Sequence, residues 1–237
     1  MVGFERQQEI MKYLREHRFA SVRELSKAVF SSEASVRRDV KQLEARGLLR
    51  QIYGGVVLPE YENSVIPLDL RDHSQSAIKE KLARRAAAYL FDGATVLMDG
   101  SSTVRRILKY ANGVRDLRII TNNVRLLSEC NSPNIQIYCT GGRYLPQSGV
   151  LVGHGAQESV RRINADLLFF SAQALSHDGI LSDSSDEETA LRQVMLAHAK
   201  QKILLCDSSK LNSSRTFTVC SKDEVDLILC DQPLPWE

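Results

Sequence analysis

Basic and hydrogen-bonding side chains concentrate in the stretch SSEASVRRDVKQLEARGLLRQIYGG, residues 31–55. A helical projection at 100° per residue brings Val36, Val40 and Leu43 to one side, which is the spacing of a buried stripe. The helix start, the opposite side and its flanks carry small, basic and hydrogen-bonding residues: Ser32, Ala34, Ser35, Arg37, Arg38, Lys41 and Gln42.

Such a face has the chemistry needed to read the major groove of DNA. Small residues allow close approach, Arg and Lys meet phosphates or guanine edges, and Ser and Gln reach other base edges. We assign base reading to Arg38 and a phosphate contact to Arg37, which lies on the flank. The alternative is a solvated surface helix in which Glu33 and Arg37 form an i, i+4 ion pair. The neighbouring elements decide between the two.

Two further helices precede this one. Residues 4–17 place Ile10 and Leu14 on one face, and the next helix starts at Ser21 with Glu24 three residues later, the spacing of a capping box. Ser32 is a suitable N-cap for the third helix. Three short helices with a tight link between the second and third predict a helix-turn-helix whose third helix enters the groove.

A small hairpin, or wing, is expected after the third helix, where GLLRQIYGGVVL offers two short apolar runs around a glycine pair. Arg50 and Tyr53 are its candidate contacts with the DNA backbone or minor groove. In the alternative interpretation, Tyr53 packs on the third helix.

Composition favours an ordinary cytoplasmic protein. The 237 residues carry a net charge of +2, yet residues 1–58 hold 11 Lys and Arg against 7 Asp and Glu, so the positive excess is N-terminal. No apolar run approaches the roughly 20 residues that span a bilayer. The five cysteines lack paired spacing, which predicts reduced core thiols rather than disulfides or zinc. The five histidines are dispersed, so we expect no metal site, and we expect no cofactor.

The pattern changes after residue 58. Residues 59–74 contain two prolines and mixed polarity and are predicted to form a linker or arm. Residues 75–237 begin with an Ala-, Lys- and Arg-rich helix and continue with six short apolar runs: ATVLMD, LRIIT, NIQIYCT, ADLLFFS, KILLCD and VDLILCD. Helical segments follow most of the early runs, which predicts an α/β domain around a mostly parallel sheet.

Polar residues follow several of these strands, where parallel sheets bind ligands. Each cluster alone is more often a helix cap than a site. Four clusters at strand ends favour a phosphorylated sugar as ligand. The candidates are Asp99, Gly100, Ser101, Ser102 and Thr103; Thr121 and Asn122; Gly141, Gly142 and Arg143; and Lys210.

The whole chain resembles the DeoR family of bacterial transcriptional regulators. The runs SEASVRRD and GLLRQIYGG match the family's DNA-binding domain. The resemblance implies an N-terminal winged helix-turn-helix domain (residues 1–58) joined to an effector domain of α/β fold (residues 75–237). That fold is related to ribose-5-phosphate isomerase and glucosamine-6-phosphate deaminase. It also implies double-stranded operator DNA and a sugar-phosphate effector as partners, and a dimer or tetramer.

Three positions depart from the family pattern: Ser101, Ser171 and Ala174 stand where glycine is usual. A Cβ at such positions narrows the space for a ligand or bars positive φ. We therefore expect either an effector of unusual shape or weak binding.

The resulting hypothesis is a sequence-specific repressor of a carbohydrate-use operon, with no catalytic residues. The alternative is a sugar-phosphate isomerase or deaminase with an appended DNA-binding domain. That enzyme needs a positioned general base. Candidates are Asp166, His177, Asp178, Asp183, Asp186 and Glu187, none of which sits in a pattern that requires catalysis. The acidic residues of the run SDSSDEET fit a solvated loop and a helix start equally well.

Overall fold

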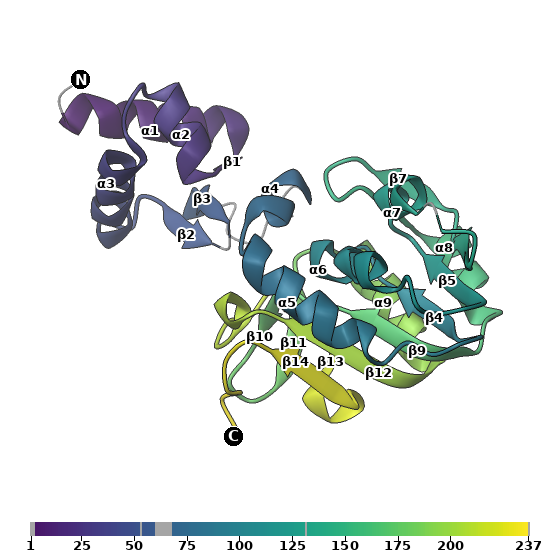
Figure 1. The fold of residues 1–237 in the computed structure, drawn as a ribbon. Helices are drawn as coiled ribbons and strands as arrows, with labels where there is room; N and C mark the ends of the chain where they lie inside the picture. The colour runs from purple at the N-terminus through teal and green to yellow at the C-terminus, as the bar shows by residue number, and fades with distance from the viewer. Residues whose placement is uncertain (1–2, 53, 60–67, 131, 237) are drawn as a thin grey trace. The chain divides into compact units, whose positions relative to one another are not determined.

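The structure is a computed structural model that describes residues 3–52, 54–59, 68–130 and 132–236. The chain divides into two compact units, Met1–Ser74 and Gln75–Glu237 (Figure 1). Within the described ranges, no helix is long and apolar enough to cross a bilayer.

The N-terminal unit has the predicted helix-turn-helix. Its helices are α1 (Gly3–His17), α2 (Val22–Ala28) and α3 (Glu33–Ala45). Ser21 and Glu24 form the predicted capping box, and the Ser32 side chain caps α3. The predicted hairpin is confirmed as β2 (Arg50–Ile52) and β3 (Gly55–Val57). A short strand that the sequence analysis missed, β1 (Phe19–Ala20), pairs with β3.

The apolar stripe of α3 is buried as its spacing predicts. Val36, Val40 and Leu43 are at most 2% exposed and pack with Ile10 and Leu14 of α1. Burial of this side fixes which residues of α3 face outward.

A further helix lies in the segment that the sequence analysis assigned to a linker. α4 (Leu68–His73) follows residues outside the described ranges and belongs to the N-terminal unit. Sequence alone did not predict this helix, because the two prolines and mixed polarity of residues 59–74 masked its short apolar pattern.

The second unit is built on a six-stranded parallel sheet, in the order β14-β12-β9-β4-β5-β6. All six predicted apolar runs form its strands. These are β4 (Thr95–Met98), β5 (Leu117–Thr121), β6 (Ile135–Cys139), β9 (Ala165–Phe170), β12 (Ala199–Cys206) and β14 (Leu227–Cys230).

Helices cover both faces of this sheet (Figure 1). One apolar cluster contains Val96 and Met98 of β4 and the helices α5 (Ser76–Ala87), α6 (Ser102–Arg105) with η2 (Arg106–Tyr110), and α7 (Val124–Glu129). Leu97 points to the other cluster, which contains α8 (His154–Arg161) and α9 (Asp186–Ala197). The alternation along β4 follows from the two-residue period of a strand.

Two smaller sheets were not predicted. β7 (Arg143–Leu145) and β8 (Val150–Val152) form a hairpin after β6. β10 (Ala174–Leu175), β11 (Ile180–Asp183) and β13 (Phe217–Ser221) form the other. The short 3-10 helices η3 (Ser208–Lys210) and η4 (Lys222–Glu224) complete the unit.

The cysteine prediction holds in part. All five thiols are free. Cys206 and Cys220 are buried, and burial raises the pKa of each to about 12. Cys139 is exposed, so its prediction as a core thiol is wrong, because the end of edge strand β6 is not covered on that side.

Candidate functional sites

The outward face of α3 presents the predicted DNA-reading residues. Ala34, Arg38, Lys41 and Gln42 are exposed, as is Arg37 on the flank. Among the described residues, no acidic side chain pairs with Arg38 or Lys41. Two cations that no carboxylate neutralises are therefore presented on one face of the helix.

The serines at the start of α3 have a local structural role. The Ser35 amide donates to Ser32 Oγ over 3.3 Å, and the two hydroxyl oxygens are 3.0 Å apart. Ser32 is exposed and Ser35 half-buried, so their DNA contacts stay a prediction.

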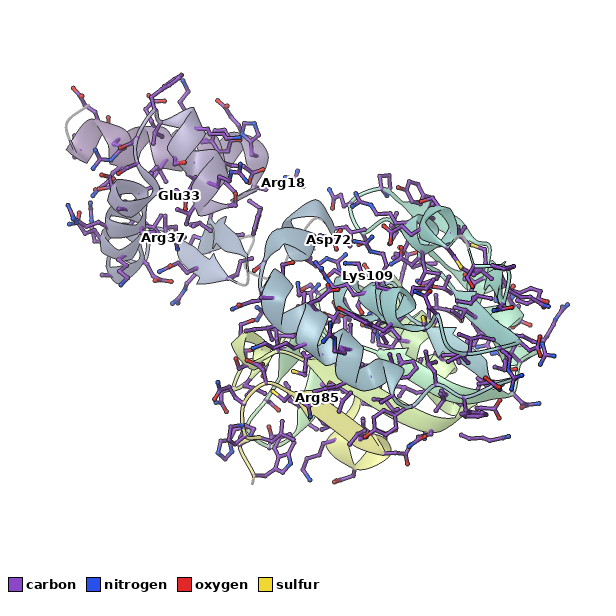
Figure 2. All side chains as sticks on the ribbon, in the orientation of Figure 1. Arg18, Glu33, Arg37, Asp72, Arg85 and Lys109 are labelled. Carbon is purple, nitrogen blue, oxygen red and sulfur yellow. The ribbon has the colours of Figure 1, made fainter. Side chains whose placement is uncertain are left out.

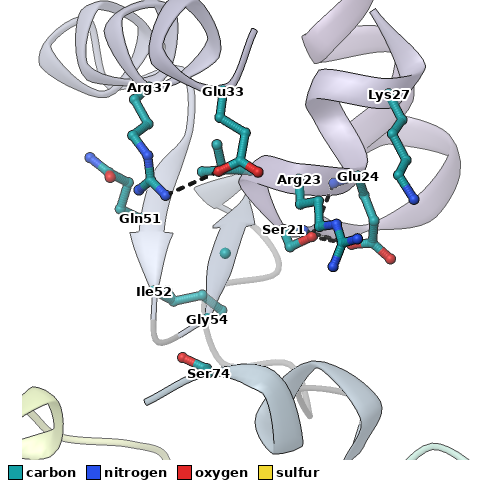
Figure 3. A pocket seen from close by; sticks show the side chains of 12 residues that line it. Ser21, Arg23, Glu24, Lys27, Glu33, Arg37, Gln51, Ile52, Gly54 and Ser74 are labelled. Carbon is teal, nitrogen blue, oxygen red and sulfur yellow. Dashed lines mark hydrogen bonds and ion pairs between the residues drawn. The ribbon is translucent and has the colours of Figure 1, made fainter. Parts of the chain in front are cut away.

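The i, i+4 pair of the alternative interpretation is present beside this face. Arg37 Nη2 donates to Glu33 Oε2 over 3.4 Å, and both side chains are well exposed. Figure 2 shows both projecting from α3. They line a groove bounded by the start of α2, the start of α3 and the hairpin, where Arg23 and Lys27 are also found (Figure 3). Glu24 also lines this groove, so its three basic side chains face two acidic ones, and the phosphate contact of Arg37 stays a prediction.

The two wing residues differ in what the structure describes. Arg50 is exposed on β2. Tyr53 lies outside the described residues, so its contact with DNA and its packing on α3 both stay predictions.

A polar network that the sequence analysis missed ties α1 to α3. Arg6 Nε donates to Asp39 Oδ2 in an ion pair, and this bond raises the pKa of Arg6. Gln7 Nε2 donates to Asp39 Oδ1 over 3.4 Å and to Gln42 Oε1 over 2.7 Å. The available signal was the position of Asp39, three residues after Val36, which places a carboxylate in the buried stripe.

The second candidate site lies where the strand order of the large sheet reverses. From β4 the chain builds outward through β5 and β6, whereas β9, β12 and β14 extend in the opposite direction. In open α/β sheets, ligands bind beyond the carboxyl ends of the strands at this point. Asp99 follows β4 and Ser171 follows β9, so both lie at the reversal.

Asp99 is buried and organises this edge. Its Oδ1 accepts from the Ser101 amide over 3.0 Å, and its Oδ2 accepts from the Ser171 amide over 3.1 Å. Arg192 Nε donates to the same Oδ2 over 3.0 Å. The carboxylate therefore joins the loops after β4 and β9, and its role as a direct ligand contact stays a prediction.

Arg192 is the main residue that sequence reasoning missed. It is 5% exposed and also donates from Nη1 to Asp183 Oδ2 over 3.0 Å. Burial acts to lower the pKa of Arg192, but attraction by Asp183 and Asp99 outweighs burial and raises the pKa. A signal was present, because Arg192 follows Glu188 by four residues on the stripe of α9 that also holds Leu191.

Lys210 reaches this edge through Ser171. Its Nζ donates to Ser171 Oγ over 2.7 Å, and Ser171 Oγ donates to the Leu205 carbonyl over 2.7 Å. Lys210 Nζ also lies 3.9 Å from Asp207 Oδ2. The hydroxyl at position 171, a departure from the family pattern, thus anchors a buried ammonium group.

The concern about backbone strain at the three departures is not confirmed. Ser101 has φ −76°, and neither Ser171 nor Ala174 is among the residues with positive φ. Ser101 instead caps α6, where its Oγ accepts from the Val104 amide over 3.2 Å.

Asn122 presents an unused acceptor at the same edge. Its Nδ2 donates to the Leu151 carbonyl over 3.1 Å, whereas its Oδ1 is buried with no hydrogen-bond partner among the described residues. Gly100 is close, since a Cβ there would lie 3.5 Å from this oxygen and 2.2 Å from Val150 Cγ1. A buried acceptor without a donor is costly, so this oxygen suits a ligand hydroxyl.

Several of the other candidates have a structural role. Thr121 Oγ1 accepts from the Asn123 amide, and Ser102 and Thr103 are buried in α6. Gly142 has φ +108°, and a Cβ there would lie 2.5 Å from the Val152 carbonyl oxygen, so this position requires glycine.

The third predicted cluster lies beside the hairpin that follows β6. Gly141 has φ +69° and open space around it. Arg143 is exposed and pairs with Glu187 of α9, so it helps to hold β7 against that helix. The ligand contacts of this cluster stay predictions.

The fold and these sites define a class: transcriptional regulators that pair a winged helix-turn-helix with an α/β sensor domain. A family model described as the DeoR C terminal sensor domain matches residues 74–232, and one described as the DeoR-like helix-turn-helix domain matches residues 6–62. The chain belongs to the DeoR family and is a sequence-specific DNA-binding transcriptional regulator.

Curated relatives align over nearly the whole chain. The HTH-type transcriptional regulator GolR of Listeria innocua is 28% identical over 99% of this chain and 92% of its own length. The HTH-type transcriptional repressor GlcR of Bacillus subtilis is 28% identical over 96% and 88%. A putative aga operon transcriptional repressor of Escherichia coli O157:H7 is 25% identical over 98% and 87%.

Solved structures give weaker similarities. Ribose 5-phosphate isomerase from Plasmodium falciparum has a TM-score of 0.42 and 14% identity, covering 58% of this chain and 53% of that one. eIF2B delta from Chaetomium thermophilum has a TM-score of 0.48 and 14% identity, covering 85% and 64%.

Proposed function

We propose that this regulator represses a carbohydrate-use operon and that a phosphorylated sugar, bound beyond β4, β5 and β9, controls its affinity for operator DNA. The observation that carries the effector site is the buried Oδ1 of Asn122, which has no hydrogen-bond partner among the residues that the structure describes. It lies at the edge where Asp99 and Lys210 both bond Ser171. A sugar hydroxyl supplies the missing donor, and the Lys210 ammonium suits a phosphate.

Repression is supported by the relatives, of which GlcR and the aga operon protein are named repressors. We further propose a dimer or tetramer, because a pair of α3 helices about 34 Å apart meets two successive major grooves.

Regulation fits this site better than catalysis does. Asp99 and Asp183 both bond to Arg192, so their carboxylates are engaged. Asp166 lies at the start of β9, the end of the strand away from Ser171, and bonds to Lys200. Glu187 pairs with Arg143. A general base needs a carboxylate that can take up a proton from the substrate. Asp99 and Asp183 are held at the site as ion pairs with Arg192, and Asp166 and Glu187 are paired with other basic residues.

The test is a thermal-shift screen of the full chain against sugar phosphates, polyol phosphates and free sugars. A ligand that binds only the folded state at 100 times its dissociation constant adds about 2.7 kcal/mol of stability, which raises Tm clearly. We expect a phosphorylated sugar to raise Tm in the parent, and the shift to be lost in Lys210→Met.

Lys200→Met is the matched control, because Lys200 is an exposed lysine near the start of β12, whereas Lys210 follows the other end of that strand. This variant is expected to keep the full shift in Tm. A panel in which no compound raises Tm would contradict the proposed effector class. A hit that Lys210→Met binds as well as the parent would contradict the proposed site.

A further inference from the structure

The side-chain network between α1 and α3 fixes how one residue of the DNA-facing helix is oriented. Asp39 is 3% exposed, and its Oδ2 is occupied by Arg6. A carboxylate is only an acceptor, so the side chain that bonds its Oδ1 must turn a donor toward it. That side chain is Gln7, whose Nε2 therefore points to Asp39.

The second hydrogen of the same Nε2 then sets the next amide. Gln7 Nε2 lies 2.7 Å from Gln42 Oε1, and a donor at this position requires an oxygen opposite. Gln42 consequently keeps its carbonyl toward α1, and within the described part of the chain its own NH2 group is left for another partner. Gln42 is exposed on the face that carries Arg38 and Lys41.

We propose that Gln7 is a positioning residue for base recognition: it holds Gln42 as a hydrogen-bond donor toward operator DNA. This inference rests on the proposed contact between the outward face of α3 and the bases. In the major groove, guanine and thymine present acceptors and adenine presents N7, whereas the hydrogen-bonding group of cytosine is the N4 donor. A glutamine fixed as a donor thus disfavours cytosine at the base that it meets.

A purely structural role explains the Gln7–Gln42 bond less well. α1 is already joined to α3 through Ile10, Leu14 and the Arg6–Asp39 pair. The bond between the half-buried Gln7 and the exposed Gln42 is open to solvent and adds little to that packing, because water competes for both groups. Its specific consequence is the orientation of Gln42, since an unrestrained glutamine offers oxygen or NH2 by a simple rotation.

The experiment is selection of binding sites from a random duplex library with the full chain, followed by affinities for all four base pairs at each selected position. The variants are Gln7→Leu and Gln42→Ala, with Gln8→Leu as the matched control, because Gln8 is an exposed neighbour on α1. Melting temperatures check that each variant is folded.

We expect the parent to disfavour cytosine at one position of each half-site by about fivefold or more, the low end of a good side chain–base contact. Gln7→Leu and Gln42→Ala lose that preference and keep the others, and Gln8→Leu keeps all of them. In Gln42→Glu the side chain can only accept, so this variant should prefer cytosine at that position. This result tests the inference even if Gln7→Leu does not fold.

Two results overturn the inference and leave the DNA-binding face in place. In one, Gln42→Ala loses the preference while Gln7→Leu retains it, so that Gln7 does not position Gln42. In the other, Gln42→Ala retains every preference while Arg38→Ala loses one, so that Gln42 reads no base. A parent that selects no sequence at all would instead overturn the proposed function together with the inference.

Discussion

At the scale of residues, the two adjacent arginines of α3 have different surroundings. Arg38 faces outward without an acidic partner among the described residues, whereas Arg37 pairs with Glu33 and lines the groove next to the hairpin. We propose that the cation in the centre of the reading face contacts bases and that the one on the flank contacts the phosphate backbone. Substitution of each arginine is therefore expected to change DNA binding in a different way.

We predict that Arg38→Ala weakens operator binding by about 1–3 kcal/mol and relaxes sequence preference at one position. Arg37→Ala should weaken all sequences alike and reduce the slope of log affinity against log salt by about 1. Titrations of selected and scrambled duplexes at several salt concentrations measure both effects. Equal affinity of both variants and the parent for the selected duplex would show that this face is wrongly assigned.

Sequence predicted only part of these residues. The exposed side of α3 and the polar strand ends were accessible, because hydrophobic spacing shows which side of an element is buried. Arg192 and Asp39 were missed, since a buried charge is stable only with a partner, and the partners lie on other elements. The effect of Ser171 was misjudged for the same reason: its hydroxyl bonds Lys210, which is 39 residues away.

At the scale of elements, long and local patterns were predictable. Each strand of the parallel sheet is an apolar run, because both faces of the sheet are covered by helices. The strands β10, β11 and β13 were missed. β10 and β11 are short, and β11 pairs with β13 more than thirty residues further along the chain. No local pattern specifies such a pairing.

Asp166 gives a pH test of how the central strands are joined. Lys200 of β12 and the Thr95 amide of β4 both bond its carboxylate and hold its pKa below the ordinary 3.8. A depressed pKa contributes stability above pH 3.8 that is lost as pH falls through the lower, folded value.

We therefore predict that the stability advantage of the parent over Asp166→Asn is present at pH 5 and shrinks as the pH falls below 3.8. Urea unfolding of both proteins across this range measures it. Lys200→Met removes the larger cause of the lowered pKa, so its stability at pH 5 should lie between those of the parent and Asp166→Asn. A difference that is constant from pH 5 to pH 2.5 would contradict the assignment.

At the scale of the whole molecule, function requires that the two units be coupled. An effector changes DNA affinity only if it binds the DNA-competent and DNA-incompetent arrangements with different affinity. The coupling is reciprocal, so DNA must change effector affinity by the same factor. Measuring both affinities therefore tests quantitatively whether effector binding and DNA binding are coupled. A measurement at one site alone does not test this.

The most direct measurement is the affinity of the full chain for its selected duplex, with and without the phosphorylated sugar found in the thermal screen, together with sugar affinity with and without duplex. We predict that saturating sugar weakens DNA binding by roughly 5- to 150-fold and that DNA weakens sugar binding equally. A sugar that binds at the β4–β9 edge but leaves DNA affinity unchanged would contradict effector-controlled repression.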